Sequence, residues 1–232
     1  MVGLASTSHS QQKAPTDEGF PLDPGTYWIY RGTDYWTPQD ARYPDGMKKV
    51  TWRTEVADVI VHPNGLIVAI VKGFPLTLDR AEGQPQEDVV IKTSDGKFFH
   101  LKDVDLPTMN TMKRVKDPSD SLDGLLRDED WFLQLPLSKG EKFCEQEQMK
   151  RSDDWYCWVT DAPRWLSLER VRGIKPTKKR MFGVRYATFP DDMRFEFVPG
   201  VGITKYEYHH HGYLYGTEIS LTEFHPGKSS HN

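Results

Sequence analysis

The sequence predicts a mainly β protein whose single antiparallel sheet curls into a barrel or half-barrel, with one or two short helices. Three observations lead to this prediction. Apolar and polar residues alternate along most of the chain, turn sequences rich in Gly, Pro, Asn and Asp separate the alternating runs, and aromatic residues make up 12% of the 232 residues. We therefore expect roughly ten to twelve strands in one domain over residues 20–225.

In the first half of the chain, each expected strand is followed by a turn or loop. The expected elements are a strand at Tyr27–Arg31, a loop over 34–46, strands at Lys48–His62 and Leu66–Phe74, and a hairpin of Val89–Thr93 with Lys97–Leu101. The alternation breaks near Asp58, which indicates a β-bulge. Leu66–Phe74 is apolar on both faces, so we expect this strand in the middle of the sheet.

The period of two is lost from Asp103 to Asp130, and the helices are expected there, covering one face or end of the sheet. Asp117 resembles a helix N-cap, and apolar residues follow it at helical spacing. Strands are expected to resume at Trp131–Leu137, Glu141–Cys144, Asp154–Thr160, Lys179–Phe189 and Met193–Val198, with residues 161–177 irregular.

The clearest strand pattern runs from Met193 to Phe224 and predicts three antiparallel strands with two tight turns. A two-residue hairpin loop at His211-Gly212 would fix the register of the last two strands. The resulting cross-strand pairs are Tyr208 with Tyr215, Tyr206 with Thr217, and Lys205 with Glu218. We expect this register because a one-residue slip would mix the two faces.

The net charge and the absence of known catalytic motifs reduce the number of function classes to consider. The net charge of -4 gives no reason to expect a nucleic-acid partner, and the longest apolar runs are too short to cross a bilayer. The chain has no serine-hydrolase elbow, zinc-protease helix, phosphate loop or dinucleotide fingerprint. Residues 1–19 lack the cationic start and long apolar run of a signal peptide, and we expect 1–19 and 226–232 to be flexible.

The histidine run at 209–211 is one candidate site. His209 and His211 lie two residues apart on one strand face and could chelate zinc or copper, which would make the protein a metal-dependent enzyme. However, Lys205 and Glu207 share that face and indicate that it is solvated. The interpretation we prefer is a solvated turn without a cofactor, because no supporting residues around such a metal can be identified.

Aromatic residues of the alternating strands suggest a second candidate site. Inside a partly open barrel, they could line a cavity for an apolar ligand. The residues that would line it are Trp28, Tyr30, Trp52, Trp131, Tyr206 and Tyr208. The alternative is that these side chains fill an ordinary core.

The charges are unevenly distributed along the chain. Asp117 to Asp130 contains six acids and one arginine, whereas residues 170–190 contain seven cations and no acid. Six of these cations could bind an anionic partner such as lipid headgroups: Arg170, Arg172, Lys175, Lys178, Lys179 and Arg180. The alternative is a solvated loop beside an edge strand that lysines protect from pairing.

Three sequence blocks stand out beyond the strand pattern. They are FPLDPGTYWIYRG at 20–32, GEKFCEQEQMKRSDDWYCWVT at 140–160 and FEFVPGVGITKYEYHHHG at 195–212. These blocks resemble the recurring blocks of a group of uncharacterised bacterial envelope proteins, predicted secreted proteins or lipoproteins. The resemblance implies an extracytoplasmic β-rich domain and supplies no activity. We therefore expect a non-catalytic binding or accessory protein of the envelope that holds an apolar or lipid-like ligand.

Cys144 and Cys157 are the chain's two cysteines. If the strands that contain them are neighbours, the two residues come within reach of a disulfide bond. Two buried thiols are the alternative. The extracytoplasmic location that the resemblance implies is oxidising, and disulfides persist there. For this reason we expect the Cys144–Cys157 disulfide.

Overall fold

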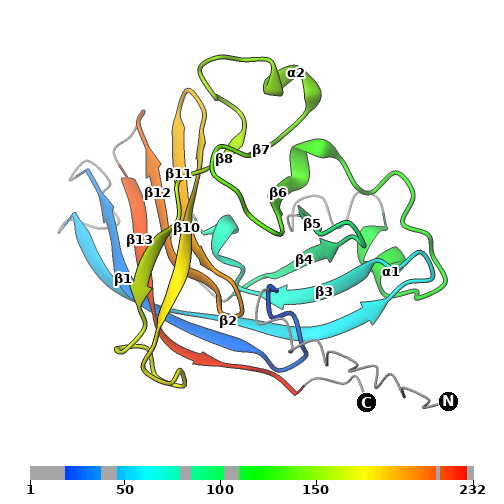
Figure 1. Ribbon diagram of the computed structural model, residues 1–232, viewed down its shortest axis with the longest axis horizontal. Coiled ribbons are helices and arrows are strands. Elements are labelled where there is room, and N and C mark those ends of the chain that lie inside the picture. The colour runs from blue at the N-terminus through cyan, green and yellow to red at the C-terminus, as the bar shows by residue number, and fades with distance from the viewer. Residues whose placement is uncertain (1–18, 38–45, 79–84, 102–109, 213–214, 229–232) are drawn as a thin grey trace, which may run out of the picture.

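The computed structural model describes residues 19–37, 46–78, 85–101, 110–212 and 215–228. Their strands form one antiparallel sheet of 13 strands that curls until it is nearly closed into a barrel (Figure 1). Two short α-helices, α1 and α2, lie beside the sheet. The expected fold class is confirmed.

The elements follow one another with few long connections. The strands are β1 (Tyr27–Trp36), β2 (Met47–Val61), β3 (Ile67–Lys72), β4 (Glu87–Lys92), β5 (Lys97–Leu101), β6 (Trp131–Gln134), β7 (Lys142–Phe143), β8 (Trp158–Thr160), β9 (Arg164–Ser167), β10 (Lys178–Ala187), β11 (Asp191–Val198), β12 (Gly202–His210) and β13 (Tyr215–His225). The α-helices are α1 (Thr111–Val115) and α2 (Gln146–Met149), and single 3-10 turns lie at Pro75–Thr77 and Asp128–Asp130.

The sheet is a continuous meander in which the first strand, β1, and the last strand, β13, are neighbours in the middle of the strand order. β1 pairs with β2 on one side and with β13 on the other, so the first and last strands join the two halves. From β1 the chain moves outward strand by strand to β6, and from β7 it returns through β8, β10, β11 and β12 to β13. The edges β6 and β7 therefore meet at a seam, and β9 pairs with β10 beside the main path.

Aromatic rings fill the inside of the sheet. At the seam, Trp131 on β6 and Phe143 on β7 have ring centroids 5.4 Å apart. Phe20, which precedes β1, contacts four other aromatic rings. Its centroid is 5.5 to 6.4 Å from the rings of Trp28, Phe74, Phe98 and Phe197. Because these rings come from both halves of the sheet, Phe20 packs against both halves in the core.

Most strand expectations of the first half are confirmed. The bulge lies between Val56 and Asp58, and β3 is buried between β2 and β4. However, β1 continues past the expected end at Arg31 and into the expected loop over 34–46, because it pairs with β2 as far as Tyr35 and with β13 as far as Trp36. Residues 38–45 of the expected loop and 1–18 and 229–232 of the expected flexible ends lie outside the described residues.

The prediction that residues 161–177 are irregular is wrong at β9. This strand is mostly exposed and pairs with β10. An exposed strand has no buried face, so its sequence carries no alternation of apolar and polar residues from which to recognise it.

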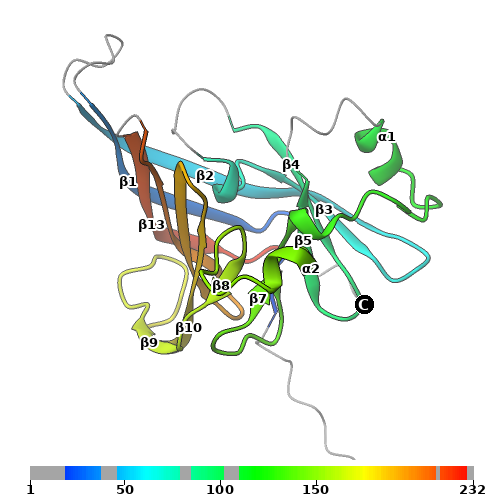
Figure 2. The same cartoon turned by 90° about the horizontal axis from the view of Figure 1, so that it is seen from above.

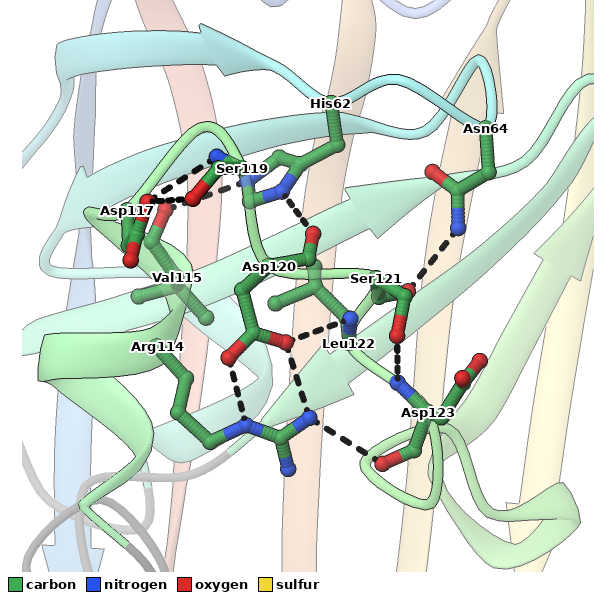
Figure 3. Close-up of polar contacts among 10 residues, drawn as sticks. All are labelled: His62, Asn64, Arg114, Val115, Asp117, Ser119, Asp120, Ser121, Leu122 and Asp123. Atoms are coloured by element: carbon green, nitrogen blue, oxygen red, sulfur yellow. Dashed lines mark hydrogen bonds and ion pairs between the residues drawn. The ribbon is translucent and has the colours of Figure 1, made fainter.

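The helix predicted after Asp117 is absent, and turns replace it. The Asp117 carboxylate accepts a hydrogen bond from the Ser119 amide at 2.9 Å. Asp120 accepts two bonds of 2.9 Å from the Arg114 guanidinium, and these, with a bond from the Leu122 amide, hold the pKa of Asp120 at about 2. The acidic residues thus close turns rather than cap a helix (Figure 3). Of the α-helices in the described chain, α1 lies within the expected segment from Asp103 to Asp130, as predicted, whereas α2 lies outside it.

The His62 side chain, which is 2% exposed, connects these turns to the sheet through contacts of its ring nitrogens. Its Nδ1 lies 2.8 Å from the Asp120 carbonyl oxygen and its Nε2 lies 3.2 Å from that of Val115. Asn64, in the turn between β2 and β3, donates to the Ser121 carbonyl at 2.8 Å. The segment after α1 therefore covers the β2–β3 end of the sheet through its backbone carbonyls (Figure 3).

The three strands predicted from Met193 to Phe224 are confirmed, but the register of the last hairpin is wrong by two residues. The observed pairs are Tyr208 with Thr217, Tyr206 with Ile219, and Lys205 with Ser220. β12 and β13 leave four residues between them, 211–214, instead of two. A shift of two residues keeps every side chain on its own face, so the alternation could not distinguish the two registers.

Candidate functional site

The six aromatic residues expected to line a ligand cavity are all buried: Trp28, Tyr30, Trp52, Trp131, Tyr206 and Tyr208. The protein's own backbone holds several of their polar atoms. The Trp28 indole donates to the Val201 carbonyl at 2.6 Å, and the Tyr30 hydroxyl donates to Ile203 at 2.9 Å. Burial raises the pKa of Tyr30 far above its ordinary value, so this hydroxyl stays protonated.

The interior space beside two of these residues, Trp28 and Tyr30, is very small. The cavity bounded by Phe20, Trp28 and Phe74 measures about 10 Å³. A volume of that order holds about one water molecule. This interior space therefore has no room for a lipid-like ligand.

A much larger pocket of about 350 Å³ lies where the β6–β7 connection meets β9, β10 and the turn between β11 and β12. Figure 2 shows β9 beside β10, and β9 lies off the main path of the sheet. The apolar lining residues are Leu135, Pro136, Leu137, Trp165, Phe182 and Pro199. The cationic lining residues are Lys178, Lys179 and Arg180. We call this the seam pocket.

Strand register explains how apolar and cationic groups come together in the seam pocket. Trp165 on β9 lies directly opposite Arg180 on β10, and directly opposed residues share a face of the sheet. Lys178 and Phe182 are two positions to either side of Arg180, so they lie on that face too. Phe182 is buried and lies opposite Phe197, whereas Trp165 is 70% exposed. The face thus passes from a buried ring to an exposed indole and two exposed cations.

Two of the pocket's cations are free of carboxylates. Within the described ranges, neither Lys178 nor Arg180 forms an ion pair with an acid, and the Arg180 guanidinium lies 5.3 Å from the centroid of Phe182. Other arginines nearby are paired: Arg164 with Glu196 and Arg172 with Glu223. Positive charge is therefore left available at the mouth of the seam pocket.

The six cations expected to bind an anionic partner are divided by the structure. Three of them line the seam pocket: Lys178, Lys179 and Arg180. Arg172 is bound to Glu223 at 3.0 Å. Arg170 and Lys175 are exposed and are not among the pocket-lining residues.

The sequence did not predict how the pocket residues come together. Trp165 is one of the seven tryptophans that could line an apolar cavity, but the β9 strand that places it in the seam pocket has no alternating pattern. Phe182 and Arg180 share a spacing of two on β10, and this was the one signal that could have placed a cation beside the apolar face.

The histidine run makes contacts that the sequence did not predict. The His209 Nδ1 is within hydrogen-bonding reach of the Tyr35 hydroxyl, and the His210 Nδ1 lies 2.8 Å from the Asp191 carboxylate. The amide of His211 donates to the Pro190 carbonyl at 2.7 Å. In the part of the chain that the structure describes, no three His, Cys, Asp or Glu side chains are arranged to hold a metal ion. The zinc or copper site stays a hypothesis that metal analysis tests.

The predicted disulfide joins Cys144 to Cys157. Phe143 on β7 lies opposite Trp158 on β8, so the next positions, the two cysteines, also face each other. Their Cα atoms are 4.9 Å apart. The bond therefore closes the end of the short β7–β8 hairpin.

Comparison with known proteins gives distant similarities of fold. No protein-family model and no curated protein sequence matches the chain. Among solved structures, a Bacteroides fragilis protein described as exported, with a YmcC-like fold, aligns at 13% identity and a TM-score of 0.41, covering 90% of this chain and 99% of its own. A Parabacteroides distasonis protein described as a lipoprotein aligns at 11% identity and a TM-score of 0.33, covering 92% and 100%. The helices of the described residues are all too short or too polar to span a bilayer.

Proposed function

We propose that this chain is a non-catalytic, extracytoplasmic binding protein that holds an apolar, lipid-like small molecule in the seam pocket. The observation that carries the proposal is the size of the seam pocket. Its volume of about 350 Å³ falls within the size range of small-molecule sites, whereas the space beside Phe20, Trp28 and Phe74, at about 10 Å³, is the size of one water.

The chemistry of the pocket lining supports binding rather than catalysis. Leucine, proline, tryptophan and phenylalanine side chains offer apolar surface, and the polar lining groups are lysine and arginine. Such a set can bind a ligand by its apolar body, because burial of apolar surface contributes roughly 25 cal/mol per Å². The exposed indole of Trp165 gives an arriving ligand the first apolar contact.

The disulfide supports the extracytoplasmic part of the proposal. Disulfides form and persist in oxidising compartments and are rare in the cytosol. The Cys144–Cys157 bond closes a loop with a sequence separation of 13 residues. Closing a loop of about this size contributes on the order of 3 kcal/mol in the chain-entropy model. An oxidising compartment is therefore the setting in which the β7 edge of the seam is most stable.

Binding of the neutral apolar dye N-phenyl-1-naphthylamine tests the proposal. The dye should gain fluorescence in the seam pocket, and Trp165→Ala should weaken its binding roughly three- to tenfold through the loss of one aromatic contact. Phe189→Ala is the matched control, because Phe189 is 79% exposed and does not line the pocket. Equal affinity of the wild type and Trp165→Ala, with both folded by circular dichroism, would contradict the proposal.

A further inference from the structure

We infer that the ligand of the seam pocket is a single-chain amphiphile with an anionic headgroup, held by Lys178 and Arg180 with its chain against Trp165 and Phe182. This inference rests on the proposed function and specifies the class of ligand. It assigns one part of the pocket to each part of the molecule.

The chain end of the site is the buried end. Phe182 is 4% exposed and Leu137 is 8% exposed, so the inner wall is already desolvated by the core. An apolar chain placed there removes further apolar surface from water without burying a polar group. The floor of the seam pocket therefore favours hydrocarbon.

The headgroup end is the exposed end of the same strand face. Lys178 and Arg180 precede Phe182 by four and two residues, respectively, and lie on the same face of β10. Neither has a carboxylate partner among the described residues, so an incoming anion displaces no acid. Arginine and lysine bind carboxylate and phosphate oxygens through charge-assisted hydrogen bonds. The mouth therefore favours a negative charge.

The volume of the pocket limits the number of chains. At about 350 Å³ the seam pocket is small, close to the lower end of the range of about 300–1,000 Å³ for small-molecule sites. A ligand with two acyl chains would leave most of its apolar surface in water. One chain with one headgroup matches both the volume and the arrangement of charges.

Displacement of the bound dye by matched twelve-carbon ligands tests the inference. Dodecanoate and dodecyl phosphate carry the anionic headgroup, and 1-dodecanol carries the same chain without charge. We expect one or both anions to bind the wild type about tenfold more tightly than the alcohol, as one charge-assisted contact predicts. The tighter anion identifies the headgroup as carboxylate or phosphate.

Two variants and two controls locate the effect. Lys178→Gln and Arg180→Gln should each weaken anion binding about tenfold and leave 1-dodecanol binding unchanged. Arg170→Gln and Lys175→Gln remove cations of the same basic run that do not line the pocket, and these controls should behave like the wild type. All four residues are exposed, so folding should be little affected.

The outcomes separate this inference from the proposed function. If the anions and the alcohol bind equally, or if the control variants weaken anion binding as much as Lys178→Gln and Arg180→Gln, the anionic headgroup is refuted while the apolar pocket stands. If dye, alcohol and anions all fail to bind the folded wild type, the proposed function itself is wrong.

Discussion

Asp191 is the residue on which the contacts of the histidine run converge. It accepts hydrogen bonds from the Tyr208 hydroxyl at 2.7 Å and from the His210 Nδ1 at 2.8 Å. Burial favours a raised pKa for Asp191, but these two hydrogen bonds outweigh it, and the net result is a lowered pKa. Burial, helped by hydrogen bonds with Tyr215 and Asp191, raises the pKa of Tyr208, so its hydroxyl keeps its proton and continues to donate.

The Asp191→Asn variant should therefore lose stability in a pH-dependent way. A carboxyl group whose pKa is lowered on folding stabilises the protein above its unfolded-state pKa, and this contribution is lost as the pH falls through the lowered folded-state pKa. At pH 7 we expect the free energy of unfolding to drop by about 1–2 kcal/mol. The difference from wild type should shrink steadily below about pH 4.

Urea unfolding at pH 7 and at pH 3 measures this effect. Asp192→Asn is the control, since the structure shows neither a side-chain hydrogen bond nor an ion pair for this described neighbour. A deficit for Asp191→Asn that is as large at pH 3 as at pH 7 would show that the charge of the carboxylate is not what stabilises the fold. The sequence drew attention to His209 and His211, but the contact to Asp191 is made by His210, because that contact depends on the pairing of β11 with β12.

Among the elements, the β1–β13 pair joins the two halves of the sheet, and Gly32 sets how closely these strands approach. Gly32 lies opposite Ile219. A Cβ atom at position 32 would lie 1.8 Å from the Glu218 carbonyl oxygen and 2.7 Å from the Ile219 Cα. These are backbone atoms, so a side chain here can be accommodated only if the strands move apart.

The Gly32→Ala variant should lower the free energy of unfolding by about 1–3 kcal/mol, the usual cost of overpacking. Gly19→Ala is the control, because a Cβ atom at position 19 meets nothing within 4 Å. Urea unfolding of both variants provides the comparison. Stability of Gly32→Ala within about 0.5 kcal/mol of wild type would mean that the β1–β13 pairing tolerates separation.

Elements with one buried face could be predicted from the sequence, and exposed elements could not. The inward positions of β12 follow from the alternation of Thr204, Tyr206 and Tyr208. The β12–β13 register could not be obtained in this way, since a two-residue shift leaves every face unchanged. β9 was missed because its residues are largely exposed. The local alternation of apolar and polar residues therefore determines the sheet face on which each side chain lies. The pairing partner of a strand depends on contacts between segments that are distant in the sequence.

At the scale of the whole molecule, the fold class follows from the sequence but the seam pocket does not. Four segments build the pocket: 135–137, Trp165, 178–182 and Pro199. They meet only because β7 returns to the edge opposite β6 and β9 folds onto β10. The basic run and the abundant aromatics were both visible in the sequence. That they form one site depends on the closure of the sheet.

The position of a heavy-atom-labelled ligand shows directly whether an anionic amphiphile occupies the seam pocket. Crystals of the protein with 12-bromododecanoate allow the bromine to be located by its anomalous scattering. We expect a bromine peak inside the seam pocket, with the carboxylate at Lys178 or Arg180. A peak in the interior beside Phe20 and Trp28, or an empty pocket at a saturating ligand concentration, would contradict it.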